Sequence, residues 1–123
     1  MEIEDWSKMT PVERDVAGYL DELGISYEFE YPVFVKDERG RPRLWTPDFY
    51  LIDIKIYIEV YESESFDLEY NKKIYAENKI DIIFLPLFKK DLMWKEHFLE
   101  LLKIIVNSSR KKLDILIETN FKK

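Results

Sequence analysis

The sequence contains no cysteine. This absence excludes a disulfide framework, a thiolate metal site and a cysteine nucleophile, and it suits a reducing cytoplasm, where we expect the protein to reside. No apolar run approaches the length of a membrane span, and the acidic N-terminus, Met-Glu-Ile-Glu-Asp, is unlike a secretory signal peptide. We therefore expect no membrane association. Glutamine is also absent, whereas lysine, glutamate, isoleucine and tyrosine are abundant, a composition typical of heat-adapted proteins.

The residues that are present suffice for one globular domain. The chain has 123 residues, of which 46% are hydrophobic and 15% aromatic, so it can bury a core and is unlike a disordered chain. Its formal net charge of -6 argues against broad binding to nucleic acid through bulk charge, although a local basic face would still allow it. We treat residues 1–123 as a single domain.

The first half of the chain predicts a helix followed by extended segments. Residues 10–24 begin with Thr-Pro-Val-Glu, a strong helix start, and end with a glycine. Residues 26–36 alternate and are rich in aromatics, which indicates extended structure bent at Pro32. Residues 37–40 form a turn signal, after which the chain returns through an extended segment to Trp45.

The second half predicts two neighbouring strands and then alternating helices and strands. The apolar run at 80–87 fits a strand that is buried on both faces, as in a parallel arrangement. The predicted elements are strands at 48–52 and 55–61, a helix at 65–78 opened by Ser65, a strand at 80–87, an amphipathic helix that ends near 107–109, and an edge strand at 113–117. The resulting order is α-β-β-β-α-β followed by an extra helix, which indicates an α/β protein.

Two acidic residues, Asp48 and Glu59, stand near the facing ends of the predicted strands 48–52 and 55–61. A hairpin returns the second strand beside the first, so the two carboxylates converge. Glu59 also interrupts an apolar run, where an unpaired buried carboxylate is costly, and alternation places it on the same face as Tyr57 and Tyr61. Converging carboxylates favour a site for a hard divalent cation. The alternative is that Asp48 only forms the turn that enters its strand.

The positions of these residues also resemble the motifs of a known family. Glutamate in the first helix, Pro47-Asp48 on the second core strand and Glu59-Val60-Tyr61 on the third resemble, in that order, the PD-(D/E)XK nucleases. The local sequence around Asp48 and Glu59 is similar to the very-short-patch-repair and Holliday-junction-resolvase-like branches of this family. The segment at 72–83 is similar to the same branches. The resemblance covers about residues 10–87 and leaves about 88–123 as a C-terminal helical extension. It implies a restriction-endonuclease-like α-β-β-β-α-β core with a mixed central sheet.

The resemblance implies a metal site and its ligands. Asp48 and Glu59 would bind Mg²⁺, for which Mn²⁺ could substitute, and the backbone carbonyl of Val60 would be a third ligand. Glu13 would bind a second ion or orient a water molecule. The alternative is that Glu13 only caps its helix, because it stands three residues after Thr10. No small-molecule cofactor is expected.

One position departs from the family pattern. Tyr61 stands where the family has a lysine, and tyrosine supplies no positive charge at neutral pH. The lysine's role could have passed to Lys72 or, next in order, Lys73 on the following helix, where such lysines otherwise form a solvated face. Tyr61 could itself position a water molecule or phosphate through its hydroxyl. The third interpretation is a degenerate site that only binds.

Basic residues surround the predicted turn at 37–40. A protruding cationic hairpin would bind a phosphate backbone, although Asp37 and Glu38 dilute its charge and ordinary surface decoration is the competing interpretation. The basic residues are Lys36, Arg39, Arg41 and Arg43.

The sequence therefore leads to a first hypothesis of a Mg²⁺-dependent DNA endonuclease that acts on branched, mismatched or otherwise distorted DNA. A homodimer would be compatible with this hypothesis, with the apolar residues of the last helix as its surface. The second hypothesis is a catalytically degenerate module of the same fold that binds nucleic acid or a protein partner. A metal-independent RNA endonuclease of the splicing type is a weaker third, because its expected histidine near a tyrosine and lysine is absent.

Overall fold

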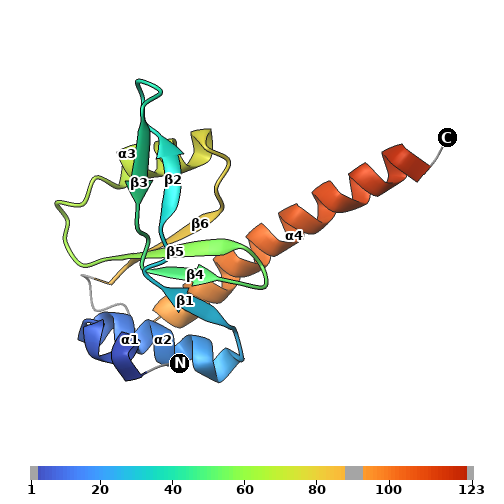
Figure 1. Ribbon diagram of the computed structural model, residues 1–123. Helices are drawn as coiled ribbons and strands as arrows, with labels where there is room; N and C mark the ends of the chain where they lie inside the picture. The colour runs from blue at the N-terminus through green and yellow to red at the C-terminus, as the bar shows by residue number, and fades with distance from the viewer. Residues whose placement is uncertain (1–2, 88–92, 122–123) are drawn as a thin grey trace.

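The computed structural model describes residues 3–87 and 93–121, with side chains described for residues 6–87 and 93–108. It combines helices with a four-stranded sheet and a separate two-stranded hairpin (Figure 1). The elements in chain order are α1 (Ile3–Lys8), α2 (Pro11–Leu23), β1 (Tyr27–Phe29), β2 (Val33–Lys36), β3 (Pro42–Trp45), β4 (Phe49–Leu51), β5 (Ile56–Tyr61), α3 (Leu68–Glu77), β6 (Ile82–Pro86) and α4 (Trp94–Phe121). The α/β class predicted from the sequence is confirmed.

Helix α2 begins and ends as its sequence predicts. Thr10 is the N-cap: its hydroxyl accepts a hydrogen bond from the Glu13 N–H at 3.2 Å, and the Glu13 carboxylate accepts one from the Thr10 N–H at 2.8 Å. This reciprocal pair satisfies two backbone donors that a helix start leaves without partners. Gly24 ends the helix in the left-handed conformation, with φ of 71°, which glycine adopts without steric cost.

The four-stranded sheet has the order β1-β4-β5-β6. Strands β1, β4 and β5 are antiparallel neighbours, whereas β5 and β6 run parallel and are connected through α3. The sheet is therefore mixed, and the parallel placement predicted for the last strand is confirmed. If the β2–β3 hairpin is treated as an insertion, the elements from α2 to β6 follow the predicted order α-β-β-β-α-β.

Strands β2 and β3 leave this sheet and pair only with each other. The predicted extended segment 26–36 is interrupted, as expected, but the break is larger than a bend because its two halves join different sheets. Glu30 has φ of 55° and Pro32 follows two residues later. A positive φ turns the chain sharply, and proline cannot donate to a strand ladder. The hairpin consequently protrudes from the body of the molecule (Figure 1).

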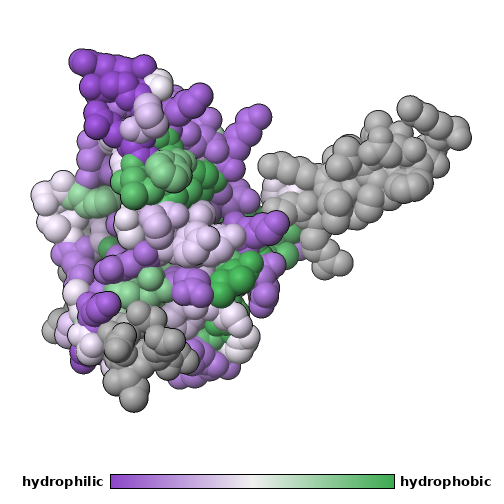
Figure 2. Space-filling model, in the orientation of Figure 1, coloured by the Kyte–Doolittle hydropathy of each residue, from purple (hydrophilic) through white to green (hydrophobic). Residues whose placement is uncertain are grey.

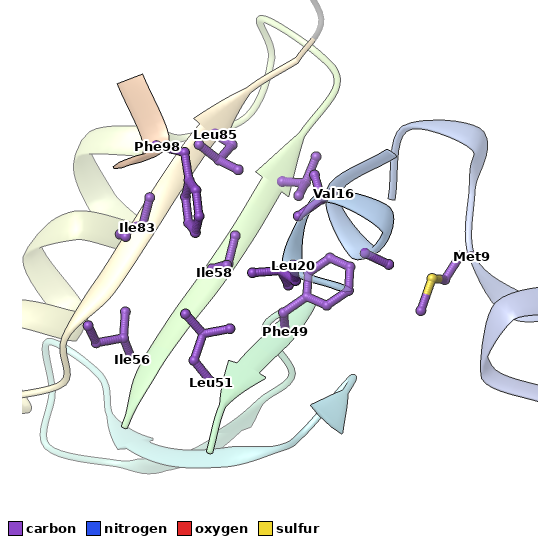
Figure 3. Packing of buried hydrophobic residues seen from close by; sticks show 12 residues of the cluster. Met9, Val16, Leu20, Phe49, Leu51, Ile56, Ile58, Ile83, Leu85 and Phe98 are labelled. Carbon is purple, nitrogen blue, oxygen red and sulfur yellow. The ribbon is translucent and has the colours of Figure 1, made fainter. Parts of the chain in front are cut away.

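The main core lies between α2 and one face of the four-stranded sheet (Figure 3). Val16 and Leu20 of α2 pack among Ile58 of β5 and its neighbours, and Phe98 at the start of α4 closes the core. A smaller cluster fills the opposite face, where α3 packs against β6 and the hairpin. Its buried members are Val35, Ile74 and Tyr75. The two clusters cover β6 on both sides, although Ile82 and Phe84 remain half-buried.

Three predictions about helices and strands are wrong or incomplete. Helix α3 starts at Leu68, not near Ser65, because Asp67 is its N-cap and accepts a hydrogen bond from the Tyr70 N–H at 3.1 Å. Helix α4 does not end near 107–109, and the predicted edge strand at 113–117 is part of it. Asparagine and serine are weak helix formers but do not stop a helix, and residues 107–121 contain neither glycine nor proline. Helix α1 was not predicted.

The end of α4 extends away from the rest of the molecule (Figure 1). Leu101 and Ile104, on its described part, are exposed. Across the residues that the structure describes, no helix combines the length and apolar character that crossing a membrane requires.

Candidate functional site

Asp48 and Glu59 lie opposite each other on neighbouring strands. The antiparallel register of β4 and β5 pairs Phe49 with Ile58, and one step further along this register Asp48 faces Glu59. Side chains that face each other in this way have Cβ atoms about 5 Å apart. A carboxylate oxygen of Asp48 also accepts a hydrogen bond from the Val60 N–H at 2.7 Å. The predicted convergence of the two carboxylates is therefore present in the fold.

Local structure holds Asp48 at the start of β4. Pro47 is fully buried, and the Asp48 carbonyl accepts a hydrogen bond from the Glu30 N–H at 2.8 Å, which ties this point to the end of β1. On β5, burial alternates along Ile56–Tyr61, and Glu59 belongs to the half-buried set. The predicted sharing of one face by Tyr57, Glu59 and Tyr61 is confirmed.

The electrostatics of this pair favour protonation. Burial raises the pKa of Asp48 to about 8, with the charge of Glu59 as the next cause. Burial likewise raises the pKa of Glu59 to about 7, although a hydrogen bond from the Asp48 backbone opposes this effect. Two carboxylates that share a partly buried site cannot both ionise freely unless a cation compensates them. Near neutral pH the pair therefore favours a bound proton or a compensating positive charge.

Glu13 both caps its helix and reaches this pair. In addition to the capping bonds with Thr10, its side chain hydrogen-bonds with Asp48 and, with its charge, raises the Asp48 pKa. Its charge also raises the pKa of Glu59. The capping interpretation of Glu13 is confirmed, and its role toward a second ion or a water molecule stays a prediction. A further acidic residue, Glu62, lies beside the start of α2, because its carboxylate accepts a hydrogen bond from the Thr10 hydroxyl at 3.5 Å.

The donor set fits a hard cation only in part. Among the described residues, no group of three or more histidine, cysteine, aspartate or glutamate side chains is arranged to hold a metal ion, so Glu13 does not complete a three-carboxylate site. Asp48 and Glu59 remain a facing pair of oxygen ligands, and the backbone of Val60 lies beside them through its bond to Asp48. Mg²⁺ uses one or two carboxylates and retains several water molecules, and such a set suits it.

None of the positions considered for the missing lysine places a cation in an ion pair with Asp48 or Glu59 among the described residues. Tyr61 is half-buried and stacks on Phe66 with ring centroids 5.0 Å apart, and burial raises its pKa, which keeps it neutral. Lys72 and Lys73 on α3 are both exposed. Lys72 borders an open groove that Tyr61 also lines. In the described part of the chain, no ion pair joins either lysine to Asp48.

The basic hairpin is organised by an acidic residue. The buried carboxylate of Asp37 accepts hydrogen bonds from the Nε atoms of Arg41 at 3.0 Å and Arg43 at 3.1 Å. It also accepts bonds from the backbone N–H groups of Arg39 and Arg41, both at 2.9 Å. These hydrogen bonds hold the Asp37 pKa at about 2. Asp37 therefore orders the hairpin and does not merely dilute its charge, while Lys36 stays exposed.

Sequence reasoning missed the aromatic surroundings of the carboxylates. Tyr75 of α3 is buried between Trp45 and Phe84, with ring centroids 5.2 Å and 6.0 Å away. Burial raises its pKa strongly, and the charges of Glu59 and Asp48 add to the effect, so its neutral hydroxyl belongs to the same electrostatic neighbourhood. No signal in the sequence of α3 distinguishes Tyr75 from any other buried helical tyrosine.

A row of tyrosines continues from the carboxylate pair along the same face of the sheet. Tyr50 pairs with Tyr57 in the register of β4 and β5, and their ring centroids are 4.6 Å apart. Tyr31 stacks on Tyr50 at 4.9 Å. Here the sequence did carry a signal, because Tyr50 follows Asp48 by two residues and Tyr57 precedes Glu59 by two, so alternation places all four on one face.

Comparison with protein-family models, with curated proteins and with solved structures gives no match for this chain.

Proposed function

We propose that this protein is a metal-dependent DNA endonuclease of the PD-(D/E)XK type, with a restriction-endonuclease-like core. The observation that carries the proposal is the facing pair of partly buried carboxylates, Asp48 and Glu59, whose pKa values are raised by burial and by neighbouring acidic groups. A divalent cation is the natural counter-charge for such a pair.

The arrangement of elements supports the same proposal. The order α-β-β-β-α-β from α2 to β6, with the hairpin as an insertion, places the carboxylates on the second and third strands of a mixed sheet. This is the order that the resemblance to these nucleases implies. Central strands hold their side chains in fixed positions, which suits a site that must orient a phosphate and a water molecule.

The chain's own residues would perform distinct tasks. Asp48 and Glu59 would hold Mg²⁺ and release their protons when it binds, with the backbone of Val60 beside them. Before an ion binds, Glu13 would keep the protonated Asp48 in place through the hydrogen bond between their side chains. The bound ion would lower the pKa of a water molecule and neutralise charge on the phosphate. Arg39, Arg41, Arg43 and Lys36 on the hairpin would bind the DNA backbone.

A second candidate function follows from Tyr61. Tyr61 is neutral, and among the described residues no ion pair joins a cation to Asp48 or Glu59. The described part of the site therefore holds no cation beside the carboxylates to stabilise developing charge on the phosphate. The same fold would then bind nucleic acid or a protein partner without cutting it. Burial, and then the charges of Glu59 and Asp48, raise the pKa of Tyr75, so its hydroxyl stays neutral and supplies no positive charge in place of that cation.

The deciding experiment measures cleavage. The protein is incubated with supercoiled, single-stranded and four-way-junction DNA in the presence of Mg²⁺, Mn²⁺ or a chelator. We expect metal-dependent cleavage that falls at least about 100-fold in the variants Asp48→Asn and Glu59→Gln, because each removes one charged ligand. The matched control is Glu64→Gln, an exposed residue of the loop after β5, which should cleave normally.

The other outcomes separate the two candidate functions. Binding to DNA without cleavage in every metal would support the non-catalytic module. Cleavage that survives in both Asp48→Asn and Glu59→Gln would place the active site elsewhere. Lys72→Ala and Lys73→Ala, compared singly, test whether either lysine contributes to the reaction.

A further inference from the structure

The β2–β3 hairpin exposes an apolar pair on its outer face. Phe34 and Leu44 are partners in the strand register, and their exposed fractions are 76% and 57%. Val33 and Val35 alternate with Phe34 and point inward, where Val35 is buried under α3. Figure 2 shows an apolar area on the body of the hairpin, below its hydrophilic tip. A large aromatic side chain left this exposed on a protruding hairpin indicates a contact surface.

Positive charge adjoins this pair at the tip of the hairpin. Between residues 36 and 43 the chain has four basic and two acidic side chains, in a protein whose formal net charge is -6. Lys36 lies on the same outer face as Phe34, by alternation along β2. Arg43 pairs with the buried Val35 in the strand register and therefore stands on the inner face, opposite to Phe34. There Arg41 and Arg43 bind Asp37 through their Nε atoms near the tip of the hairpin, while about half of each side chain remains exposed, at 51% and 48%. Their remaining N–H groups are therefore held in position to bind an anion.

The hairpin leads directly to the carboxylate pair. Strand β3 ends at Trp45, three residues before Asp48, and the Trp45 ring contacts Tyr75, whose pKa responds to the charges of both carboxylates. On the other side of that pair, Tyr50 and Tyr57 occupy the next pair of facing positions on the sheet. The exposed Tyr31 stacks on Tyr50 and ends the row.

We propose that the outer face of the hairpin, with Tyr31, binds a nucleic-acid strand whose bases are unstacked and directs it to Asp48 and Glu59. This proposal rests on the proposed function and adds its substrate class. The combination of a flat apolar side chain with Lys36 on the same face and arginines at the adjoining tip matches a polymer that has both exposed base faces and phosphates. A duplex conceals its base faces, so the surface favours single strands and locally opened DNA. An apolar protein partner would not require the cations at the tip of the hairpin.

The test measures binding without cleavage. Fluorescence anisotropy is recorded in chelator with a labelled oligothymidine of about 20 nucleotides, a length that spans such a surface, and with a labelled duplex of the same length. Phe34→Ala is compared with Phe34→Trp, which keeps a ring for stacking, and with Ile104→Ala, which removes an apolar side chain of α4 that is 60% exposed. Circular dichroism verifies that each variant is folded.

We expect tighter binding to the single strand than to the duplex. Phe34→Ala should weaken single-strand binding by about 10-fold, the effect of one lost base stack, while Phe34→Trp and Ile104→Ala bind as the parent does. Equal binding to single strand and duplex, or unchanged binding in Phe34→Ala, would overturn the proposal. So would a Phe34→Ala variant that changes the sedimentation coefficient of the protein alone, because the face would then be a protein interface.

The two proposals can fail separately. If no substrate is cut but Phe34→Ala weakens single-strand binding, the hydrolytic function is wrong and the strand-binding surface stands. If DNA is cut and Asp48→Asn abolishes the cut, while Phe34→Ala leaves binding unchanged, the hydrolytic function stands and the surface is wrong.

Discussion

At the scale of single residues, the central feature is the like-charged pair of Asp48 and Glu59. Facing carboxylates on neighbouring strands destabilise a sheet when both are ionised, and here Glu13 adds a third acidic group nearby. A protein that keeps such a pair loses stability when it contains no cation. This cost is typical of sites that bind an ion or a substrate.

The pH dependence of unfolding tests whether Asp48 and Glu59 destabilise the protein when both are ionised. The pKa of each carboxyl is higher in the folded protein, about 8 and about 7, than in the unfolded chain, at about 4. Their contribution to stability is therefore fully present below about pH 4 and is lost as the pH rises through about 7 to 8. At pH 8.5, in chelator, Asp48→Asn should raise the free energy of unfolding by about 1–2 kcal/mol, a value reduced because the side chain remains partly exposed.

Urea titrations at about pH 4 and pH 8.5 measure this difference. The two proteins should be nearly equal at the lower pH, and Mg²⁺ or Mn²⁺ should stabilise the parent protein more than Asp48→Asn. A variant that is less stable than the parent at both values of pH would mean that Asp48 is ionised and well compensated in the fold.

At the scale of elements, the β2–β3 hairpin depends on Asp37. This carboxylate accepts bonds from two arginine side chains and two backbone N–H groups, and it is the only charged residue buried within the described part of the chain. Glu38 ties the same turn to α3, since it accepts a hydrogen bond from the Tyr70 hydroxyl at 2.6 Å. The hairpin is thereby stabilised without belonging to the main sheet.

Loss of the Asp37 charge should loosen the hairpin. Its pKa of about 2 lies below the unfolded value of about 3.9, so its contribution is present above that value and is lost as the pH falls toward 2. The pH dependence of this contribution is therefore opposite to that of Asp48 and Glu59, whose contribution is lost as the pH rises. We expect Asp37→Asn to speed hydrogen exchange at the Arg39 and Arg41 amides by about 10-fold or more.

Nuclear magnetic resonance measures this exchange residue by residue. The amides of the main sheet, such as that of Ile58, should retain their protection in Asp37→Asn. Uniformly faster exchange across the sheet would instead show that the hairpin and the sheet unfold together.

At the scale of the whole molecule, α4 has two parts with different roles. Phe98 is buried in the main core, whereas the helix after its first turns extends away from the body (Figure 1). Removing residues 109–123 should therefore change the free energy of unfolding of the remaining domain by less than about 0.5 kcal/mol, the usual effect of a change outside the core. Phe98→Ala should cost about 3–5 kcal/mol, as expected for a large buried side chain.

Denaturant unfolding compares these two variants directly. Sedimentation velocity on the full chain and the shortened chain also tests the homodimer predicted from the sequence. A shortened chain that is much less stable, and that has lost a dimer, would mean that the end of α4 is part of an interface between two copies.

Local signals predicted much of the fold and the placement of Asp48 opposite Glu59. The capping residues Thr10 and Gly24 were predicted because their effects depend only on the nearest few residues. Asp48 and Glu59 were predicted to face each other because a short connection forces adjacent strands to pair. The start of α3 was misplaced at Ser65, since both Ser65 and Asp67 are good N-cap residues and tertiary packing selects between them.

Other parts of the site depend on distant contacts. Tyr75 lies near the carboxylates only because α3 packs across the sheet. This packing joins segments that are distant in the sequence, so no local pattern predicted it. Likewise, the sequence showed acidic residues that dilute the basic hairpin, but the geometry makes Asp37 the group that orients two arginines. The length of α4 was underestimated because weak helix formers at 107–109 resemble a stop when they are considered alone.

The sequence by itself determined the α/β class, the order of elements from α2 to β6 and the convergence of Asp48 with Glu59, because hydrophobic period, capping and strand pairing act over short distances along the chain. Only the tertiary structure decided that β2 and β3 leave the main sheet, that Phe34 and Leu44 face solvent, and that Tyr75 and the row of tyrosines adjoin the carboxylates. Burial and electrostatic coupling are properties of segments brought together in space, and they arise only when the chain is packed.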